Sequence, residues 1–343
     1  MAQLQSTSIT GSLNLAASTS GSASCGFLWV QQNASPAPIR QTLKYSYYGS
    51  IFTAGGNMNI AGYCHAGAGT ATSALAMAGC SRDACTEAYN GTSWSTGGAM
   101  STGRASLAAA GASNTAALAF GGYQGPPSFS TLSCTEAYNG TSWASGGAMI
   151  NANRTHGGAG TSTSALAFGG FSNAGFTVLA CTEAYNGTSW SSGGAMSTAR
   201  CLLAGAGTSN TAALAFGGYQ PGNGCSNSTE AYNGTSWSAG GNMIVPKYAG
   251  AGAGTSTAAR SMGGLEITNT YTCTETYNGS SWSAAATLIT GRYNTAGAGT
   301  SASPLVFGGS APSGTTSTSE AFSTGIQTCT FNGVVKSPPY AGV

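Results

Sequence analysis

The nonapeptide Thr182-Glu-Ala-Tyr-Asn-Gly-Thr-Ser-Trp190 decides the fold, because it recurs along the chain. Complete, variant or shortened copies of it begin at Thr86, Thr135, Thr229, Thr274 and Ser319. The tryptophans of the five full copies are 45 to 49 residues apart. A period of this length is typical of a β-propeller, in which each repeat forms one four-stranded blade.

A second repeated segment predicts the other two strands of each blade. Its first part, Gly-Ala-Gly-Thr, consists of small residues that suit a crowded innermost strand. Its second part, Ala-Leu-Ala-Phe-Gly-Gly, alternates in the way that strands do. In the nonapeptide, Asn-Gly separates two short strands, which favours a hairpin and is typical of a type I′ turn with positive φ at both central residues.

The copies predict six blades and also how the ring closes. The inner strand pair occurs six times, whereas the outer pair is intact five times and the last copy lacks its tryptophan. Phe52 lies six residues before Met58, as Trp94 lies six before Met100. We therefore expect an all-β, six-bladed propeller over residues 45–331, closed by a strand within residues 45–58. Seven blades is the alternative.

The ends of the chain differ from the repeats. Residues 1–44 are rich in Ser, Ala and Thr, and we expect an extended N-terminal arm that anchors the chain to a larger assembly. Residues 332–343 are expected to be a C-terminal tail. The first ten residues contain neither a basic segment nor an apolar one, so no secretory signal is predicted.

Composition excludes several classes of function. The chain has 343 residues, of which 5% are charged, and its net charge is +2. No stretch approaches the roughly 18 apolar residues of a membrane span. Ten Lys and Arg residues without a basic run disfavour nucleic-acid binding. Eight acids and two histidines leave little material for acid–base catalysis.

Most of the charges occupy two positions of the repeat, which predicts a structural ring of ion pairs. A buried charge must be paired or neutralised, and one acid and one base per blade would satisfy each other. The acids of this expected ring are Glu87, Glu136, Glu183, Glu230, Glu275 and Glu320. Its bases, which are expected four residues after the repeat methionine or Leu288, are Arg104, Arg154, Arg200, Lys247 and Arg292.

The histidines and cysteines also follow the repeat. His65 and His156 share one repeat position at the entry to the innermost strand, and lie on different blades without a nearby acid cluster. This arrangement is a poor metal site, so neither a metal nor a cofactor is predicted. Four of the ten cysteines directly precede the Thr-Glu pair and are expected to be small buried thiols. Cys80 and Cys85 are close enough in sequence to allow a pairing.

The repeat resembles the kelch repeat. The resemblance rests on Tyr, Trp five residues later, then Met, then Arg, a strand of small residues, and a strand ending in Gly-Gly. It covers roughly residues 45–331 and implies the propeller fold. The Asn-Gly turn departs from the longer turn usual in kelch proteins. The alanine- and glycine-rich composition of the repeats is also similar to that of kelch-like structural proteins of marine phages.

Variable loops are the expected binding surface. The connections between the second and third strands of each blade share one face of the propeller with the links between blades. Of all the connections, these second-to-third ones differ most in length and sequence. Aromatic and amide side chains in them would suit stacking on sugars or on a protein surface. The candidate binding residues are Tyr123, Gln124, Phe129, Phe171, Phe176, Tyr219, Gln220 and Tyr271.

Two functional hypotheses follow. The first, which the phage resemblance implies, is a non-enzymatic virion protein, a tail fibre, decoration or adhesin, present in many copies. Its arm would bind other virion proteins, and its propeller would attach to a glycan or protein receptor on the host surface. It would bind no nucleic acid and insert into no membrane. The alternative is a carbohydrate-active or oxidative enzyme on a kelch-like propeller, and fold alone does not choose between them.

Overall fold

The computed structural model describes residues 27–31 and 40–334, except 80–83, 126–127, 173–176 and 268. Side chains are described between Gly49 and Thr324, with the same gaps. Contacts divide the chain into two units, Ser50–Thr324 and a second unit made of Met1–Gly49 with Gly325–Val343. Every regular element among the described residues is a β-strand.

The unit Ser50–Thr324 is a six-bladed β-propeller, which confirms the predicted fold class. The first blade consists of β3 (Ala66–Thr70), β4 (Ser73–Met77), β5 (Thr86–Tyr89) and β6 (Trp94–Thr96). The second consists of β7 (Ala108–Ser113), β8 (Ala116–Phe120), β11 (Thr135–Tyr138) and β12 (Trp143–Ser145). The third consists of β13 (Gly157–Thr161), β14 (Ser164–Phe168), β17 (Thr182–Tyr185) and β18 (Trp190–Ser192).

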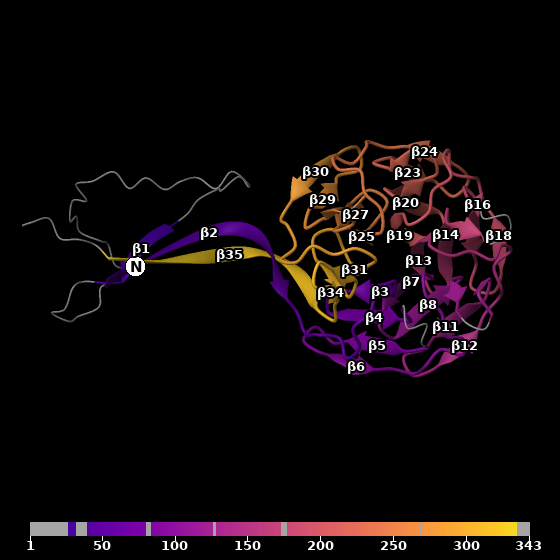
Figure 1. Cartoon of the computed structure of the whole chain (residues 1–343), viewed down its shortest axis with the longest axis horizontal. Helices are drawn as coiled ribbons and strands as arrows, with labels where there is room; N and C mark the ends of the chain where they lie inside the picture. Colours follow the sequence, from indigo (N-terminus) through magenta and orange to yellow (C-terminus); the bar gives the residue numbers. More distant parts are fainter. Residues whose placement is uncertain are drawn as a thin grey trace, which may run out of the picture. The chain divides into compact units, whose positions relative to one another are not determined.

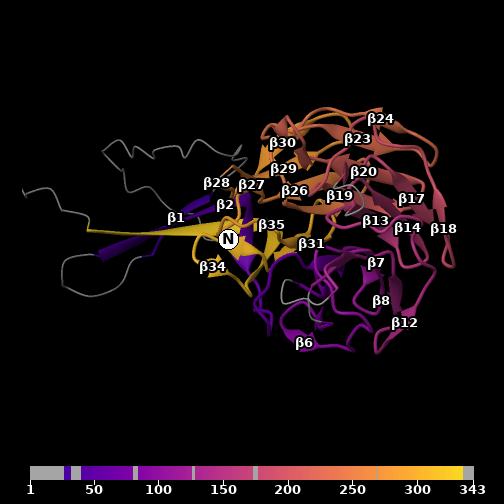
Figure 2. The same ribbon diagram turned by 45° about the vertical axis from the view of Figure 1, so that its right-hand side comes forward.

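The remaining blades continue the same antiparallel order from the centre outwards. The fourth consists of β19 (Ala204–Ser209), β20 (Ala212–Phe216), β23 (Thr229–Tyr232) and β24 (Trp237–Ala239). The fifth consists of β25 (Ala251–Gly254), β26 (Ala259–Met262), β29 (Thr274–Tyr277) and β30 (Trp282–Ala285). The innermost strands of all blades surround the centre of the ring (Figures 1 and 2).

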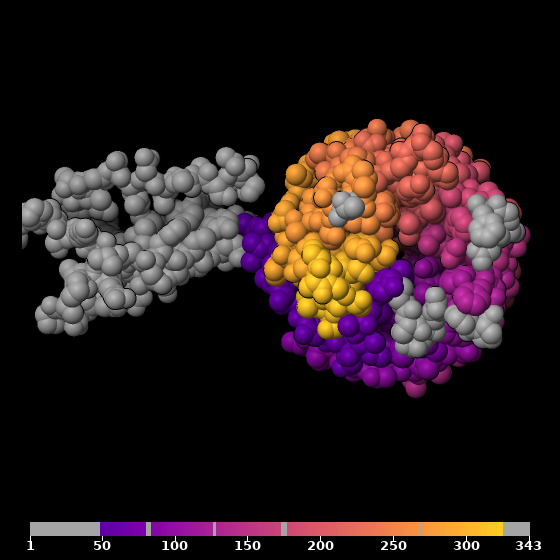
Figure 3. All heavy atoms as spheres, viewed as in Figure 1, coloured from indigo at the N-terminus to yellow at the C-terminus, as the bar shows by residue number. Residues whose placement is uncertain are grey.

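The sixth blade is built from both ends of the propeller sequence. Its strands are, in order from the centre, β31 (Ala296–Gly299), β32 (Pro304–Phe307), β35 (Ser319–Val334) and β2 (Arg40–Ala54). Phe52 packs on Phe322 with ring centroids 5.3 Å apart, and the Gly55 N–H donates to the Ser319 carbonyl at 2.8 Å. The first blade lies beside the sixth in the space-filling view (Figure 3). The two ends of the propeller sequence thus pair within one sheet and close the ring.

The second unit contains a further strand pairing. β1 (Phe27–Gln31) pairs antiparallel with β2, from Phe27 opposite Ser46 to Gln31 opposite Thr42. The predicted arm, residues 1–44, therefore includes strand residues at 27–31 and from 40 onwards. Its residues 1–26 and 32–39, and the tail from residue 335, lie outside the described residues.

Large side chains fill the seams between neighbouring blades. Trp190 of the third blade packs at a tilt against Phe120 of the second, with centroids 4.9 Å apart, and its Nε1–H donates to Thr135 Oγ1 at 3.0 Å. Phe120 and Leu118 are fully buried in this seam. The small residues of the innermost strands permit close approach of the blades, because a Cβ on Gly158 would lie 2.7 Å from the Ala109 carbonyl oxygen.

The Asn-Gly hairpins form, but the predicted type I′ turn is wrong. Tyr89 pairs with Trp94, so four residues rather than two form the loop. Gly91 has a φ of +97°, whereas the φ of Asn90 is not positive. The Asn90 Oδ1 accepts the backbone N–H groups of Thr92 and Ser93, both at 2.9 Å. The asparagine thus satisfies the turn with its side chain instead of a left-handed backbone.

The variable connections form small hairpins beside the links between blades. The described hairpin strands are β9 (Tyr123–Gln124), β10 (Ser130–Thr131), β15 (Phe171–Ser172), β16 (Thr177–Val178), β21 (Tyr219–Gln220), β22 (Gly224–Cys225), β27 (Leu265–Glu266), β28 (Asn269–Thr270), β33 (Ser310–Ala311) and β34 (Gly314–Thr315). Ala105, in a link, bridges to Tyr123, in a hairpin. Hairpins and links therefore share one side of the propeller, called here the loop face.

Candidate binding face

Four blades contain a buried ion pair between the repeated glutamate and a base. In each pair the base lies in the link that enters the blade and the glutamate lies on the third strand. The nitrogen–oxygen distances are 3.2 Å for Arg104–Glu136, 2.8 Å for Arg200–Glu230, 3.4 Å for Lys247–Glu275 and 2.6 Å for Arg292–Glu320. Their side chains are at most 4% exposed. Each pair ties a blade to the link before it.

The glutamates also hold the links through backbone groups. Glu230 accepts the Ser197 N–H at 2.7 Å, and Glu320 accepts the Ile289 N–H at 2.7 Å. The bases satisfy carbonyl oxygens in return, since Arg200 donates to Gly217 O at 2.9 Å and Ser228 O at 2.8 Å. Charge-assisted bonds of this kind rigidify the scaffold around the loop face.

Arg154 does not belong to the ion-pair ring, which corrects the sequence prediction. It follows Met149 by five residues, whereas Arg200 follows Met196 by four, so the equivalent residue of the third blade is Asn153. Asn153 is buried, and its amide donates to Gly169 O at 2.7 Å. Glu183 has no cationic partner among the described side chains. It accepts the N–H groups of Ile150 at 2.7 Å and Asn151 at 2.9 Å.

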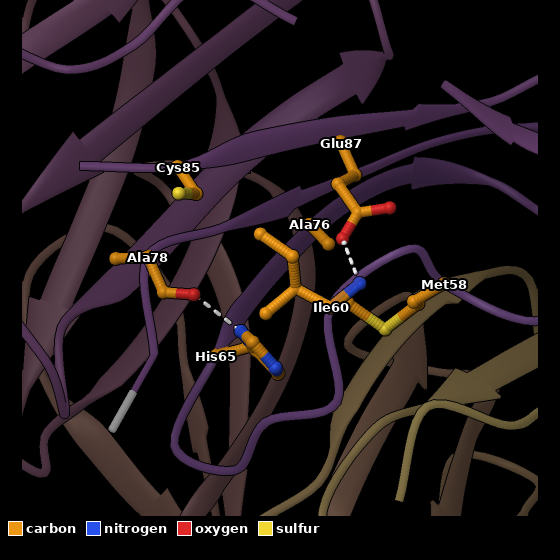
Figure 4. Close-up of a pocket in the computed structure, with 7 residues that line it drawn as sticks. All are labelled: Met58, Ile60, His65, Ala76, Ala78, Cys85 and Glu87. Carbon is orange, nitrogen blue, oxygen red and sulfur yellow. Dashed lines mark hydrogen bonds between the residues drawn. The ribbon is translucent and has the colours of Figure 1, made fainter. Parts of the chain in front are cut away.

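The first blade also lacks a base at this position. Its equivalent residue is Gly62, and Glu87 accepts the N–H groups of Asn59 at 2.7 Å and Ile60 at 3.0 Å. A small cavity remains beside Glu87, and its lining includes His65 and Cys85 (Figure 4). Its volume is about 10 Å³, close to the space that one water needs. His65 Nδ1 hydrogen-bonds the Ala78 carbonyl oxygen.

The two histidines occur in the two blades that lack a ring base. His65 follows Gly62 by three residues, and His156 follows Asn153 by three. The four blades with a base carry Leu107, Leu203, Gly250 and Thr295 at that position. His156 is 5% exposed, and burial lowers its pKa to about 3. The His156 ring packs against the ring of Phe120, with centroids 5.6 Å apart.

A closed circle of backbone hydrogen bonds surrounds the propeller axis on the loop face. Each N–H donates to the carbonyl of the equivalent residue one blade earlier, over distances of 2.7 to 3.3 Å. The six residues all have φ between +49° and +60°, a backbone conformation that is strained for residues other than glycine. They are Cys64, Ser106, Thr155, Leu202, Ala249 and Asn294. These residues and their neighbours, including His65 and His156, line a cavity of about 90 Å³.

Arg154, which has no glutamate partner among the described side chains, contacts the rings of two predicted binding residues on the loop face. Its Cζ lies 4.5 Å from the ring centroid of Tyr123 in β9 and 4.8 Å from that of Phe171 in β15. Arg154 comes from the link between the second and third blades, and its backbone bridges to Phe171. The neighbouring Thr155 and His156 line the central cavity. The three side chains therefore form one cluster beside that cavity.

A second aromatic cluster lies at the next two blades. Tyr219, on β21, is 40% exposed and packs edge-on against Tyr248 with centroids 6.0 Å apart. Beside Tyr219, Gln220 donates to Ser226 Oγ at 3.2 Å. Burial raises the pKa of Tyr248 above its usual range.

Three further predicted binding residues, Tyr271, Phe129 and Gln124, lie in or beside hairpins of the loop face. Tyr271 donates its hydroxyl to Glu266, and this bond raises the pKa of Tyr271 to about 12. Phe129 precedes β10 and is 57% exposed. Gln124 lies in β9 and is half-buried, and Phe176 lies outside the described residues.

The sequence analysis did not recognise the repeat position directly after the ring position as a part of the loop face, and it assigned Arg154 to the ring. In chain order the residues at this position are Tyr63, Ala105, Arg154, Cys201, Tyr248 and Tyr293. Most of them bridge to the first residue of a hairpin. A signal for this position existed in the sequence, because three of the six blades carry Tyr there.

The described residues contain no group of three or more His, Cys, Asp or Glu that could hold a metal ion. Within the same residues, no helix is long and apolar enough to cross a membrane. The predicted Cys80–Cys85 pairing lies outside the described residues, because Cys80 does.

Comparisons with known proteins support the fold alone. No protein-family model matches the chain, and no curated protein matches its sequence. A solved structure titled "Structure of YjhT" superimposes with a TM-score of 0.66 at 14% identity, covering 79% of this chain and 99% of the other. The chain is therefore similar in fold to this propeller, and its function must be argued from its own residues.

Proposed function

We propose that this chain is a non-enzymatic virion protein of a phage, a kelch-like propeller whose loop face attaches the particle to a glycan or protein on the host surface. The N-terminal region would bind other virion proteins, and the propeller would be displayed in many copies. The phage assignment rests on the resemblance of the alanine- and glycine-rich repeats to kelch-like phage proteins.

One observation carries the proposal of a binding face. Glutamates that could serve as catalytic acids are buried in the scaffold, where they bind link N–H groups in all six blades. In contrast, the loop face varies from blade to blade and presents aromatic side chains such as Tyr219 and Phe129. A repeated scaffold with an asymmetric aromatic surface suits recognition rather than turnover.

An adsorption experiment tests this function. Purified chain is incubated with host cells, and the bound fraction is compared for the parent, Tyr219→Ala, Tyr248→Ala and Thr235→Ala. Thr235 is an exposed residue of the Asn-Gly turn in the fourth blade, on the side away from the loop face by strand topology, and serves as the control. We expect the tyrosine variants to bind about tenfold more weakly and the control to bind like the parent.

Two results would contradict the proposal. Equal adsorption of all four proteins would exclude the loop face around Tyr219 as the attachment surface. Turnover of a sugar or alcohol substrate by the parent would favour the alternative of an enzyme on the same scaffold.

A further inference from the structure

The guanidinium of Arg154 is held in place by side chains and backbone of two blades. The rings of Tyr123 and Phe171 contact it at 4.5 and 4.8 Å. The Arg154 N–H donates to Phe171 O at 3.1 Å, and the Phe171 N–H donates back to Arg154 O at 2.9 Å. Stacked arginines keep their planar donor edge, because aromatic rings interact with the face of the guanidinium. The arginine is thus fixed before any ligand arrives.

The positive charge of Arg154 is not neutralised by the described part of the chain. The four bases of the ring each contact a glutamate within 3.4 Å. By contrast, no carboxylate among the described side chains pairs with Arg154. Between residues 101 and 200 the only acids are Glu136 and Glu183, and both bind link N–H groups in the scaffold.

We propose that Arg154, Tyr123 and Phe171 form a subsite for an anionic group, a carboxylate or sulfate carried by a sugar of the attached glycan. This inference rests on the proposed function and names the ligand chemistry of its binding face. A carboxylate or sulfate accepts two parallel N–H bonds from a guanidinium edge, which a neutral hydroxyl does not do. Such an acceptor would also supply the counter-charge that the half-buried arginine lacks.

The position of the cluster suits an extended ligand. Arg154 directly precedes Thr155 and His156, which line the central cavity, and Tyr123 and Phe171 belong to hairpins of adjacent blades. A glycan bound across these blades would place its anionic substituent at Arg154 and its rings near the hairpin aromatics. The aromatic surface at Tyr219 and Tyr248, farther along the same loop face, is available for further sugar units.

Calorimetric titration of the full chain tests the subsite. The probes are an oligogalacturonate for carboxylate, a sulfated oligosaccharide for sulfate, and a neutral galactose oligomer of the same length. We expect at least one acidic probe to bind, more weakly as salt increases, and the neutral probe to bind at least tenfold more weakly. Arg154→Gln should weaken acidic binding about tenfold, and Arg154→Lys should fall between it and the parent because lysine keeps the charge without the planar edge.

The controls separate binding from folding. Thr235→Ala should bind every probe like the parent, and the melting temperature of each Arg154 variant is measured before titration. Tyr123→Phe keeps the ring beside Arg154 and should retain acidic binding, whereas Tyr123→Ala should weaken it. Arg154→Gln that binds the acidic probes as the parent does would overturn the inference, as would failure of both acidic probes to bind at millimolar concentration.

The outcomes distinguish this inference from the proposed function. If Tyr219→Ala abolishes adsorption to host cells but Arg154→Gln changes neither adsorption nor acidic binding, the loop face remains the attachment surface and the anionic subsite is wrong. If Arg154→Gln abolishes acidic binding but no loop-face variant affects adsorption, the subsite remains and the proposed function is wrong.

Discussion

Arg200 and Glu230 form an ion pair of 2.8 Å between two buried side chains, and one blade earlier Asn153 occupies the position of Arg200. The same glutamate position therefore has a full counter-charge in the fourth blade and only backbone and amide donors in the third. This difference permits matched tests within one chain.

Glu230→Gln should destabilise the propeller more than Glu183→Gln. The first change leaves the buried Arg200 charge without its carboxylate, which costs about 3–5 kcal/mol. The second removes a carboxylate that accepts the N–H groups of Ile150 and Asn151 but strands no cation. We expect it to cost about 1–3 kcal/mol, because one amide oxygen remains to accept a bond. Urea unfolding of both variants measures the difference, and equal losses would refute the role given to Arg200.

Repetition explains what the sequence could and could not predict. Six exact or variant copies of Ala-Leu-Ala-Phe-Gly-Gly, and six copies of the glutamate position, determine blade number, strand order and scaffold charges, because each blade must pack on the next. Arg154 was misplaced because its assignment depended on a register of one residue, and Asn153 carries no charge to reveal the ring position. The clustering of Arg154 with Tyr123 and Phe171 depends on hairpin geometry across two blades, which no repeat pattern encodes.

Introducing a base at the ring position of the third blade, which is Asn153, should stabilise the protein. The double variant Asn153→Arg with His156→Leu reproduces the Arg200 and Leu203 of the fourth blade, and the new arginine would face Glu183. We expect a gain of about 1–2 kcal/mol over His156→Leu alone, since Glu183 already lies in a site that orients it with two N–H groups. Thermal unfolding of the double and single variants gives the comparison. A double variant less stable than His156→Leu would show that the third blade has no room for the arginine.

Deletion of the closing strand should weaken the ring more than deletion of the residues before it. Removing residues 1–54 takes away Phe52, which is 5% exposed and packs on Phe322, together with the Thr53 hydroxyl bond to the Ala321 carbonyl oxygen at 3.2 Å. Removing residues 1–40 leaves these contacts in place. We expect the longer deletion to lose more than the roughly 3–5 kcal/mol of a buried phenylalanine. Melting curves of the two proteins that coincide would contradict closure by this strand.

Stability should fall with acid in a way that depends on His156. Burial lowers its pKa from 6.5 to about 3 in the folded chain, so the imidazole is neutral there while the unfolded chain binds a proton below pH 6.5. The stabilising contribution of neutral His156 is therefore complete above pH 6.5 and is lost progressively as the pH falls towards 3. A single group of this kind changes the free energy of unfolding by at most about 1.4 kcal/mol per pH unit.

His156→Leu isolates this contribution, because leucine occupies the same position in the second and fourth blades as Leu107 and Leu203. Its free energy of unfolding, measured with urea between pH 4 and 7, should decline less steeply with acid than that of the parent. The other titrating groups, including His65 and the glutamates, are common to both proteins and cancel in the difference. Parallel curves would mean that His156 is protonated as readily in the folded chain as in the unfolded one, and that the seam beside Phe120 admits its charge.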